Sequence, residues 1–293
     1  MSAESFSSGS GYEDRCFTVA DGLTLHFRDY AGGADKPPIL CLHGLTRNAR
    51  DFAEFAERYS PRFRVLALDF RGRGGSDYDP VPMRYNPLTY ARDVIELLDH
   101  LGIPEAVFVG TSLGGLVMMT VAAMAPQRIA ASILNDIGPD IDPQGVQRIL
   151  TYVGSDVRFG SWDEAAQAIA GHYGAAFEHY GHEDWVRMAK RVCREEAGEI
   201  RFDYDMAIAE PFRAGGPTPN VDLWPLFGVL AQKPLLVVRG AKSDLLTAET
   251  ATKMQAAAPN MQLAVIPGVG HAPELSEPEA VAAIDELFEG IAG

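Results

Sequence analysis

Short apolar runs alternate with helical patterns along most of this 293-residue chain, and this alternation restricts the folds open to it. Residues 37–44 (PPILCLHG) and 105–111 (EAVFVGT) are almost continuously apolar, as expected for strands covered on both faces. Residues 87–102 (PLTYARDVIELLDHLG) carry apolar side chains at helical spacing and end at a glycine, which often stops a helix. Alternation of this kind predicts an α/β fold with a mostly parallel central sheet and helices on both faces.

The remaining elements follow from the same two patterns. The segment 23–30 (LTLHFRDY) alternates polar and apolar residues, which favours an antiparallel strand. Further strands are expected over residues 62–70, 128–136, 233–240 and 261–268. Further helices are expected over residues 50–59, 113–125, 247–258 and 278–290.

The strand–helix rhythm breaks between about residues 138 and 224. This stretch holds helical patterns over 161–180 and 183–197 but no clear buried strand. We therefore expect a core of residues 13–137 and 225–293, with residues 138–224 inserted after the sixth strand as a helical lid. An insertion at the carboxyl end of a strand lies where open α/β sheets bind ligands.

The N-terminus and the cysteines indicate a cytoplasmic protein. Residues 1–12 are rich in serine and glycine and are expected to form a disordered tail. The start MSAESFSSGSGYEDR has neither the basic nor the apolar region of a signal peptide. Cys16, Cys41 and Cys193 are odd in number and show no C-x-x-C spacing, which favours reduced thiols.

The charge of the chain excludes one large class of partners. With 40 acidic and 25 basic residues the net charge is −15. Binding to nucleic acid through phosphate contacts needs clustered lysine and arginine, so no nucleic-acid partner is expected. No apolar run reaches the length of a membrane span, so no membrane partner is expected either. The sequence leaves the oligomeric state open.

A serine stands between glycines in VFVGTSLGGL, residues 107–116, where a strand pattern gives way to a helix pattern. Gly110-Thr111-Ser112-Leu113-Gly114 matches G-x-S-x-G, the pattern of a nucleophile elbow. Because glycine lacks Cβ, such a turn can be tight enough to lift the serine hydroxyl above the sheet. The N–H groups at the start of the following helix favour developing negative charge. The pattern therefore predicts Ser112 as a nucleophile.

A serine nucleophile needs a base, and the base needs an acid that orients it. In this architecture the order along the chain is Ser, then Asp or Glu, then His. Asp244 and His271 each follow a glycine that ends a predicted strand, so both lie at the same sheet edge as Ser112. We predict Ser112, Asp244 and His271 as a catalytic triad. Asp136, after the preceding strand, is the alternative acid.

Two backbone N–H groups are expected to hold the negative oxygen that forms during acyl transfer. One is the N–H of Leu113, which follows the nucleophile, and the other is the N–H of Leu45 in the loop LHGLT, residues 42–46. His43 in this loop is interpreted as a structural residue that holds the turn and not as a proton carrier.

With these residues in place, the chain resembles the α/β-hydrolase superfamily, in its serine-nucleophile, esterase-like branch. The matching residues are His43-Gly44, 69–77 (DFRGRGGSD), 110–114, Asp244 and 270–278 (GHAPELSEP). The resemblance implies a hydrolase that cleaves a carboxylic ester, lactone or thioester through an acyl-enzyme, without a cofactor.

The resemblance also indicates which subfamilies this chain does not match. Epoxide hydrolases and haloalkane dehalogenases use an aspartate nucleophile, whereas position 112 is serine. The glycine run of the lipase oxyanion loop is missing, and so is the Gly- and Pro-rich loop common in C–C hydrolases. Two alternatives remain open. One is hydrolysis of a C–C bond in a ring-fission diketone, and the other is a small-molecule receptor built on a hydrolase fold.

The substrate is expected to be a small apolar or aromatic molecule held between lid and sheet. The candidate pocket residues are Arg47, Trp162 and Tyr173. Arg47 lies two residues beyond Leu45 and is placed to meet a substrate carboxylate, although a solvated arginine is the other interpretation. No metal site is expected, because no carboxylate or cysteine pattern completes the group of His172, His179 and His182.

Overall fold

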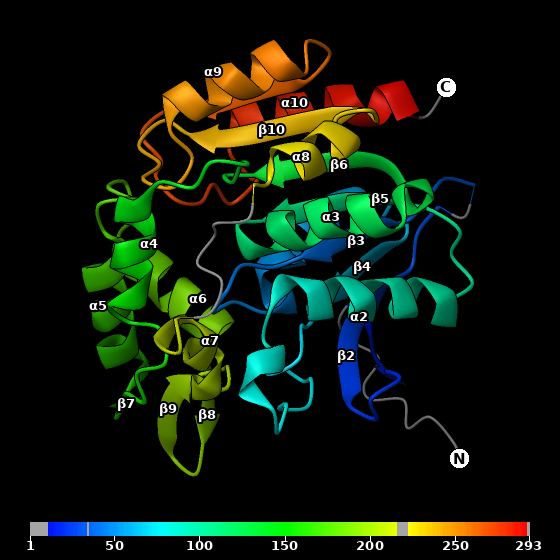
Figure 1. The fold of residues 1–293 in the computed structure, drawn as a ribbon. Coiled ribbons are helices and arrows are strands. Elements are labelled where there is room, and N and C mark those ends of the chain that lie inside the picture. The colour runs from blue at the N-terminus through cyan, green and yellow to red at the C-terminus, as the bar shows by residue number, and fades with distance from the viewer. Residues whose placement is uncertain (1–10, 34, 216–221, 292–293) are drawn as a thin grey trace.

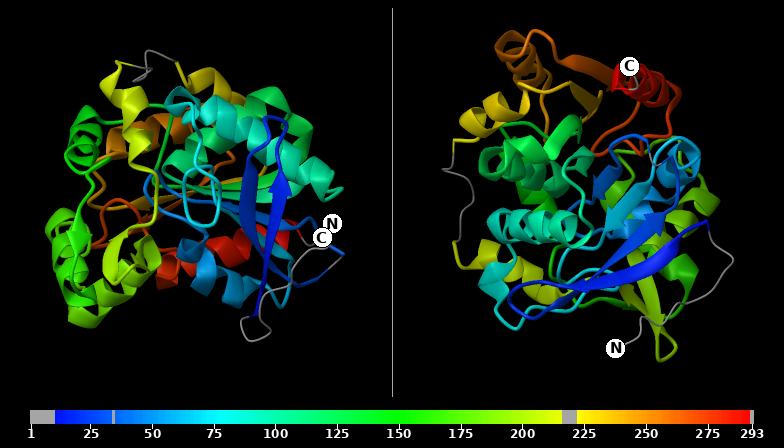
Figure 2. Two further views of the ribbon diagram at one scale, coloured as in Figure 1. Left: turned by 90° about the horizontal axis from the view of Figure 1, so that it is seen from below. Right: turned by 90° about the vertical axis from the view of Figure 1, so that its right-hand side faces the viewer.

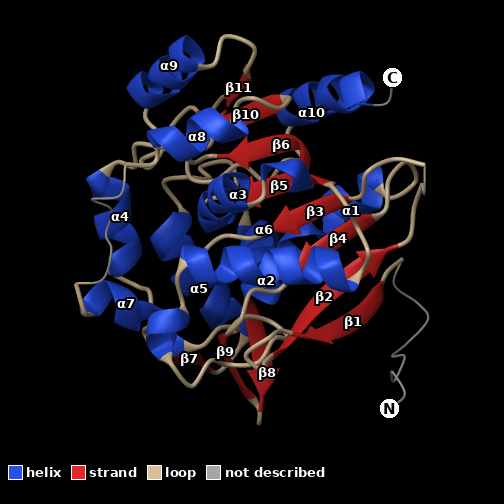
Figure 3. Ribbon diagram, turned by 45° about the vertical axis from the view of Figure 1, so that its right-hand side comes forward, coloured by secondary structure: helices blue, strands red, loops and turns tan. Residues whose placement is uncertain are grey.

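An eight-stranded sheet runs through the centre of the computed structural model, which describes residues 11–33, 35–215 and 222–291. Its strand order is β1-β2-β4-β3-β5-β6-β10-β11, and helices cover both faces (Figures 1 and 3). The pairs β1–β2 and β2–β4 are antiparallel, and the other neighbouring pairs in this order are parallel. The strands are β1 (Glu13–Thr18), β2 (Thr24–Tyr30), β3 (Ile39–Leu42), β4 (Val65–Leu68), β5 (Ala106–Thr111), β6 (Ile129–Asn135), β10 (Leu235–Gly240) and β11 (Gln262–Ile266). The prediction of a mostly parallel sheet is confirmed.

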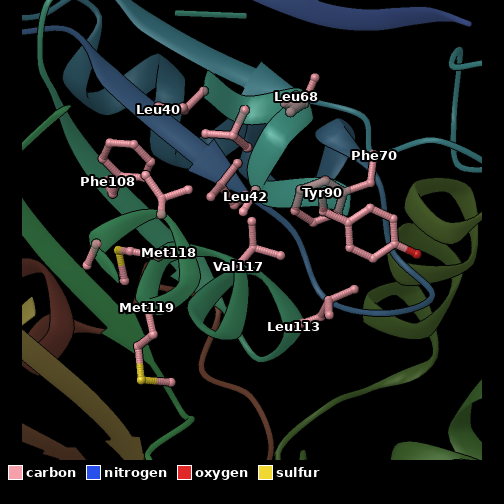
Figure 4. Packing of buried hydrophobic residues seen from close by; sticks show 14 of the residues in the cluster. Leu40, Leu42, Leu68, Phe70, Tyr90, Phe108, Leu113, Val117, Met118 and Met119 are labelled. Atoms are coloured by element: carbon pink, nitrogen blue, oxygen red, sulfur yellow. The ribbon is translucent and has the colours of Figure 1, made fainter. Parts of the chain in front are cut away.

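Two layers of helices bury the two faces of this sheet, on opposite sides of it (Figure 2). Alternate residues of β3 pack into different layers, because successive side chains of a strand point to opposite faces of the sheet. Leu40 and Leu42 join one buried cluster with side chains of α2 and α3, including Tyr90 and Val117 (Figure 4). Cys41 joins the other cluster, with side chains of α1 and α10. The core helices are α1 (Ala53–Tyr59), α2 (Pro87–His100), α3 (Leu113–Met124), α8 (Trp224–Leu230), α9 (Ala248–Ala257) and α10 (Pro278–Ile291).

The lid follows β6 and lies at the side of the molecule to which β6 and β10 point (Figure 1). It contacts loops that follow core strands: residue Phe177 bridges to Val269, and the N–H of Gly270 donates to the carbonyl of Ala176 at 2.8 Å. The lid elements are α4 (Pro143–Leu150), β7 (Arg158–Phe159), α5 (Trp162–Tyr173), α6 (His182–Val192), β8 (Cys193–Glu196), β9 (Glu199–Phe202) and α7 (Glu210–Arg213). The lid is therefore placed over the sheet edge where a ligand is expected.

The lid is not purely helical, so that part of the sequence interpretation is wrong. β7, β9 and β8 form a three-stranded antiparallel sheet. The helix expected over 183–197 ends at Val192. A hairpin then turns at Ala197 and Gly198, whose φ angles are 54° and 82°. Two successive positive φ angles match the right-handed twist of a hairpin, and glycine at the second position adopts this conformation readily.

Differences at the N-terminus are smaller. Residues 13–18 form β1, an edge strand that the sequence patterns did not predict, since most of its side chains are exposed. Residues 1–10 of the expected tail lie outside the described residues, as do residues 216–221 of the expected lid. Within the described ranges, no helix is both long and apolar enough to cross a membrane.

The start of α3 packs directly on the backbone of β3. A Cβ built on Gly114 would lie 2.0 Å from the carbonyl oxygen of Leu42 and 2.6 Å from its carbonyl carbon. Neither atom can move without shifting the central strand. The second glycine of the G-x-S-x-G pattern therefore sets how closely this helix approaches the sheet.

We expect Gly114→Ala to lower the free energy of unfolding by about 1–3 kcal/mol, because the added methyl group overpacks a backbone contact. Gly171→Ala is the matched control, since a Cβ at Gly171 in α5 would meet nothing within 4 Å. The control variant should gain about 0.5–1 kcal/mol from the higher helix propensity of alanine. Urea unfolding of both variants tests this. Equal effects of the two substitutions would contradict the close approach of α3 to β3.

Candidate active site

Ser112 occupies the sharp turn between β5 and α3. Its backbone angles are φ 52° and ψ −113°, which a non-glycine residue rarely adopts. Its N–H donates to the carbonyl oxygen of Asn135 at 3.0 Å, which ties the turn to the end of β6. A Cβ on Gly110 would lie 2.6 Å from the carbonyl carbon of Gly114, so the turn depends on the flanking glycines. The side chain of Ser112 lines a pocket between sheet and lid.

His271 lines the same pocket and is oriented by Asp136. The Nδ1 atom of His271 lies 2.7 Å from Oδ2 of Asp136, and this carboxylate has no exposed surface. The carboxylate also accepts hydrogen bonds from the N–H of Gly240, at 2.8 Å, and the hydroxyl of Ser243, at 2.6 Å. Three donors therefore compensate a fully buried negative charge. Because Nδ1 is used for Asp136, Nε2 is the ring nitrogen that is left for a group in the pocket.

The acid that hydrogen-bonds His271 is Asp136, so on this geometry the orienting role predicted for Asp244 is wrong. Its carboxylate instead pairs with the guanidinium of Arg148 on α4, with Nε–Oδ2 at 2.5 Å and Nη2–Oδ1 at 2.9 Å. Partial burial would raise the pKa of Asp244, but the Arg148 hydrogen bond and charge lower it overall. β6 and β10 are neighbours in the sheet, so acids after either strand lie close to the histidine loop. Chain order could not decide between them.

The loop after β3 presents the N–H of Leu45 next to the serine. A Cβ on Gly44 would lie only 3.9 Å from Cβ of Ser112, and Leu45 lines the pocket. Within the described ranges, neither the N–H of Leu45 nor that of Leu113 has a hydrogen-bond acceptor. These are the two donors that the sequence predicts for an oxyanion hole, and both remain available to a ligand.

His43 fixes the orientation of the Leu45 amide. Its Nε2 accepts from the N–H of Phe70 at 3.1 Å, so its proton is on Nδ1, which donates to the carbonyl of Gly44 at 2.7 Å. That carbonyl belongs to the same peptide unit as the Leu45 N–H, and in a trans peptide the two groups point in opposite directions. Because His43 holds the Gly44 carbonyl on one side of the loop, the N–H of Leu45 points to the other side. Complete burial lowers the pKa of His43 to about 4.

The lid closes the pocket with aromatic and charged side chains. Tyr173 lines it, as predicted from the sequence, and its hydroxyl hydrogen-bonds the hydroxyl of Tyr152 at 3.0 Å. Arg47 also lines it and pairs through Nε with Oδ2 of Asp51 at 2.6 Å. Trp162, the third predicted residue, does not line the pocket but packs against the core cluster on the α10 side. Its position at the start of α5 turns it toward the lid's own interior.

The pocket contains further residues that the sequence patterns did not single out. Arg191, at the end of α6, pairs with Glu274, three residues beyond His271. Glu274 lies in the segment GHAPELSEP, so its position near the site was foreseeable. Arg191 lies in a charged stretch of the lid that carries no signal of its own. Asn135 lines the pocket as well, and its Nδ2 donates to the carbonyl of Pro273 at 2.8 Å.

Each of the three lid histidines contacts a different partner. His182 lies 3.0 Å from the carboxylate of Asp163, and the ring of His172 packs against Tyr152. His179 packs against Tyr180. In the part of the chain that the structure describes, no group of three or more His, Cys, Asp and Glu side chains is arranged to hold a metal ion.

Comparison with known proteins relates the whole chain to hydrolases. The sequence model of the "Alpha/beta hydrolase family" matches residues 39–284. A 3-hydroxybutyrate-oligomer hydrolase from Cupriavidus necator is 32% identical over 284 residues, which cover 94% of this chain and 96% of that protein. A 2-(acetamidomethylene)succinate hydrolase from Mesorhizobium japonicum is 29% identical over 253 residues, 85% of each chain. The crystal structure of an alpha/beta hydrolase from Novosphingobium aromaticivorans is 51% identical, with a TM-score of 0.92 over 96% of this chain and 99% of that one.

Burial of His43 should make stability depend on pH. The folded protein keeps this imidazole neutral down to about pH 4, whereas an unfolded chain protonates it near its ordinary pKa of 6.5. Between these values the unfolded state binds more protons, so stability falls as the pH falls. The loss begins at the upper value and is complete at the lower one, where it reaches about 3 kcal/mol.

His43→Asn isolates this effect, because it keeps a donor near Nδ1 and removes the titrating ring. We expect the stability advantage of the wild type over the variant to shrink by about 1.4 kcal/mol between pH 7.5 and pH 5.5. Urea unfolding at the two pH values measures it. An advantage that stays constant would show that His43 is not held neutral.

Proposed function

This chain belongs to the alpha/beta hydrolase family, and we propose that it cleaves a carboxylic ester through Ser112, His271 and Asp136. The observation that carries the proposal is the 2.7 Å contact between Nδ1 of His271 and the buried carboxylate of Asp136. His271 lines the pocket that Ser112 enters from a strained turn. A base that is oriented by an acid and shares a pocket with a serine is the arrangement that activates a serine hydroxyl.

The proposed reaction begins at the serine hydroxyl. With its Nδ1 proton donated to Asp136, His271 has Nε2 free to accept the proton of Ser112 as the oxygen attacks the carbonyl. The negative oxygen of the tetrahedral intermediate accepts hydrogen bonds from the N–H groups of Leu45 and Leu113. His271 then gives its proton to the leaving alcohol, which departs and leaves an acyl-serine. Water, deprotonated by His271, attacks the acyl carbonyl, and the acid is released as His271 returns the proton to the oxygen of Ser112.

Similarity to the 3-hydroxybutyrate-oligomer hydrolase supports an ester as the bond that is cleaved. Hydroxy acids join to each other through ester bonds, so an enzyme for such oligomers is an esterase in its chemistry. Lactones and thioesters present the same carbonyl to the same groups and belong to the proposed class. The substrate pocket is formed by Tyr152, Tyr173 and Ile149 of the lid above the serine.

We also place the protein in the cytoplasm. Its cysteines are free thiols, and those of Cys41 and Cys193 are buried. Unpaired cysteines persist most readily in a reducing compartment, which supports this placement.

Turnover of p-nitrophenyl esters, from acetate to octanoate, tests the nucleophile. Ser112→Ala should fold like the wild type and lower kcat by at least about 10⁴-fold, because no other group can form the acyl-enzyme. The chain length that gives the highest kcat/KM reports the depth of the pocket. Wild-type rates in the Ser112→Ala variant would refute the serine mechanism.

The same assay distinguishes the roles of Asp136 and Asp244. Asp136→Asn should lower kcat by about 10³- to 10⁴-fold, because the imidazole loses the carboxylate that orients it and stabilises its cation. Asp244→Asn should cost less than about tenfold, because a partly exposed ion pair contributes at most about 1 kcal/mol. Circular dichroism controls for folding. The acid assignment fails if Asp244→Asn proves to be the more damaging of the two.

A further inference from the structure

The pocket above Ser112 contains two arginines, which is unusual for a site that binds a purely apolar ester. Arg47 comes from the oxyanion loop and Arg191 from the end of α6. Their side chains are only 18% and 19% exposed, so both guanidinium groups are largely removed from solvent. Burying a charge is costly unless it has partners, so the partners of each arginine show what the pocket still requires.

The guanidinium of Arg47 uses only part of its hydrogen-bonding capacity. A guanidinium carries five N–H groups in a planar fork, and Arg47 uses Nε for the carboxylate of Asp51. Among the described residues, neither terminal nitrogen of Arg47 has a protein acceptor. The edge formed by those two nitrogens matches the geometry of a carboxylate, which accepts two parallel hydrogen bonds from it.

The position of Arg47 brings this free edge near the reacting centre. The N–H of Arg47 donates to the carbonyl of Gly44 at 3.2 Å, so the arginine belongs to the same turn as Leu45. A Cβ built on Gly44 would lie 3.4 Å from Cγ of Arg47 and 3.9 Å from Cβ of Ser112. Cγ of Arg47 and Cβ of Ser112 therefore flank the same glycine, and both residues line the pocket. A small molecule in this pocket is in reach of both residues.

The neighbours of Arg47 include donors as well as the carboxylates of Asp51 and Glu274, which also line the pocket. One hydroxyl of the Tyr152–Tyr173 pair donates to the other, which leaves one O–H of the pair for another acceptor. Burial raises the pKa of Tyr152, so this hydroxyl keeps its proton. Nε of Arg191 is buried and has no hydrogen-bond partner among the described residues. The unused donors of Arg47, Arg191 and the tyrosine pair can thus bind an acceptor, while in the described part of the chain Oδ1 of Asp51 is an unused acceptor in the same pocket.

The core holds Arg191 in place through its backbone. The carbonyl of Arg191 accepts hydrogen bonds from Nδ2 of Asn48 and from Nε of Arg50, both at 2.9 Å. Both donors lie directly after Arg47 in the chain, so one short segment positions both arginines. The two arginines of the pocket are therefore positioned by lid and core together.

We propose that the substrate carries a carboxylate close to the ester, and that the guanidinium of Arg47 binds this carboxylate while Ser112 attacks the ester carbonyl. This assignment rests on the proposed function and narrows it to half-esters and acyl derivatives of acids with a second carboxylate. Arg191 lines the same pocket, where its charge is paired with that of Glu274. The ester carbonyl, held at Leu45 and Leu113, fixes the other end of the molecule.

Two esters of nearly equal shape test the proposal. Monoethyl succinate ends in a carboxylate, whereas ethyl 4-methylpentanoate has an isopropyl group in the same place. We expect the wild type to show a kcat/KM at least about tenfold higher for the anionic ester, measured by titration of the released acid. A preference for the neutral ester, or no preference, would overturn the proposal.

Substitutions at Arg47 identify the binding group. Arg47→Gln should reduce the anionic-to-neutral ratio of kcat/KM by about 10- to 100-fold, through KM for the anionic ester. Arg47→Lys keeps the charge without the fork and should fall between wild type and Arg47→Gln. Arg187→Gln is the matched control, because Arg187 lies one turn before Arg191 on α6 and is 62% exposed. A ratio that falls equally in the control, or stays constant in Arg47→Gln, would refute a role for Arg47.

Failure of this proposal is distinguishable from failure of the ester mechanism. Ser112-dependent turnover of neutral p-nitrophenyl esters tests the mechanism alone. Calorimetric binding of monoethyl succinate to Ser112→Ala tests the carboxylate site without turnover, and should weaken at least about tenfold when Arg47→Gln is added. Equal affinity of Ser112→Ala for the two esters would overturn the carboxylate site even in an active esterase.

Discussion

The buried carboxylate of Asp136 is the interaction on which the rest of the site depends. It follows β6, receives the N–H of Gly240 at the end of β10, and contacts Nδ1 of His271 after β11. A single side chain therefore joins the ends of three adjacent strands at the edge under the lid. Without these donors a fully buried charge would destabilise the fold, so the same contacts that orient the histidine also stabilise the sheet edge.

The elbow and the histidine loop are tied to that edge by the neighbouring residue. The carbonyl of Asn135 accepts from the N–H of Ser112, and its Nδ2 donates to Oγ1 of Thr111 and to the carbonyl of Pro273. Ser112 and His271 thus come from distant parts of the sequence but share one anchor at the end of β6. Rigid strand ends hold such groups more accurately than free loops do, which suits a reaction that depends on sub-ångström alignment.

Much of this architecture was predictable from the sequence, because its signals are local. Apolar runs identify the parallel strands, and G-x-S-x-G identifies the turn at Ser112 through the steric needs of glycine. The acid was not predictable in this way, since Asp136 and Asp244 both follow a strand. Which of them meets His271 depends on side-chain packing between β6, β10 and the lid. The hairpin of β8 and β9 was missed because its exposed, charged residues resemble the polar face of a helix.

Burial explains how the two aspartates divide their roles. The site of Asp136 offers three donors and no solvent, so it suits a carboxylate that orients an imidazole. Asp244 is 35% exposed and pairs with the guanidinium of Arg148, so it suits a contact between lid and core. The partly hydrated ion pair of Asp244 can separate at modest cost, whereas Asp136 cannot change partners without leaving a buried charge unpaired. The ion pair of Asp244 with Arg148 therefore joins lid and core as an exchangeable contact, and the hydrogen bond of Asp136 holds His271 in a fixed position.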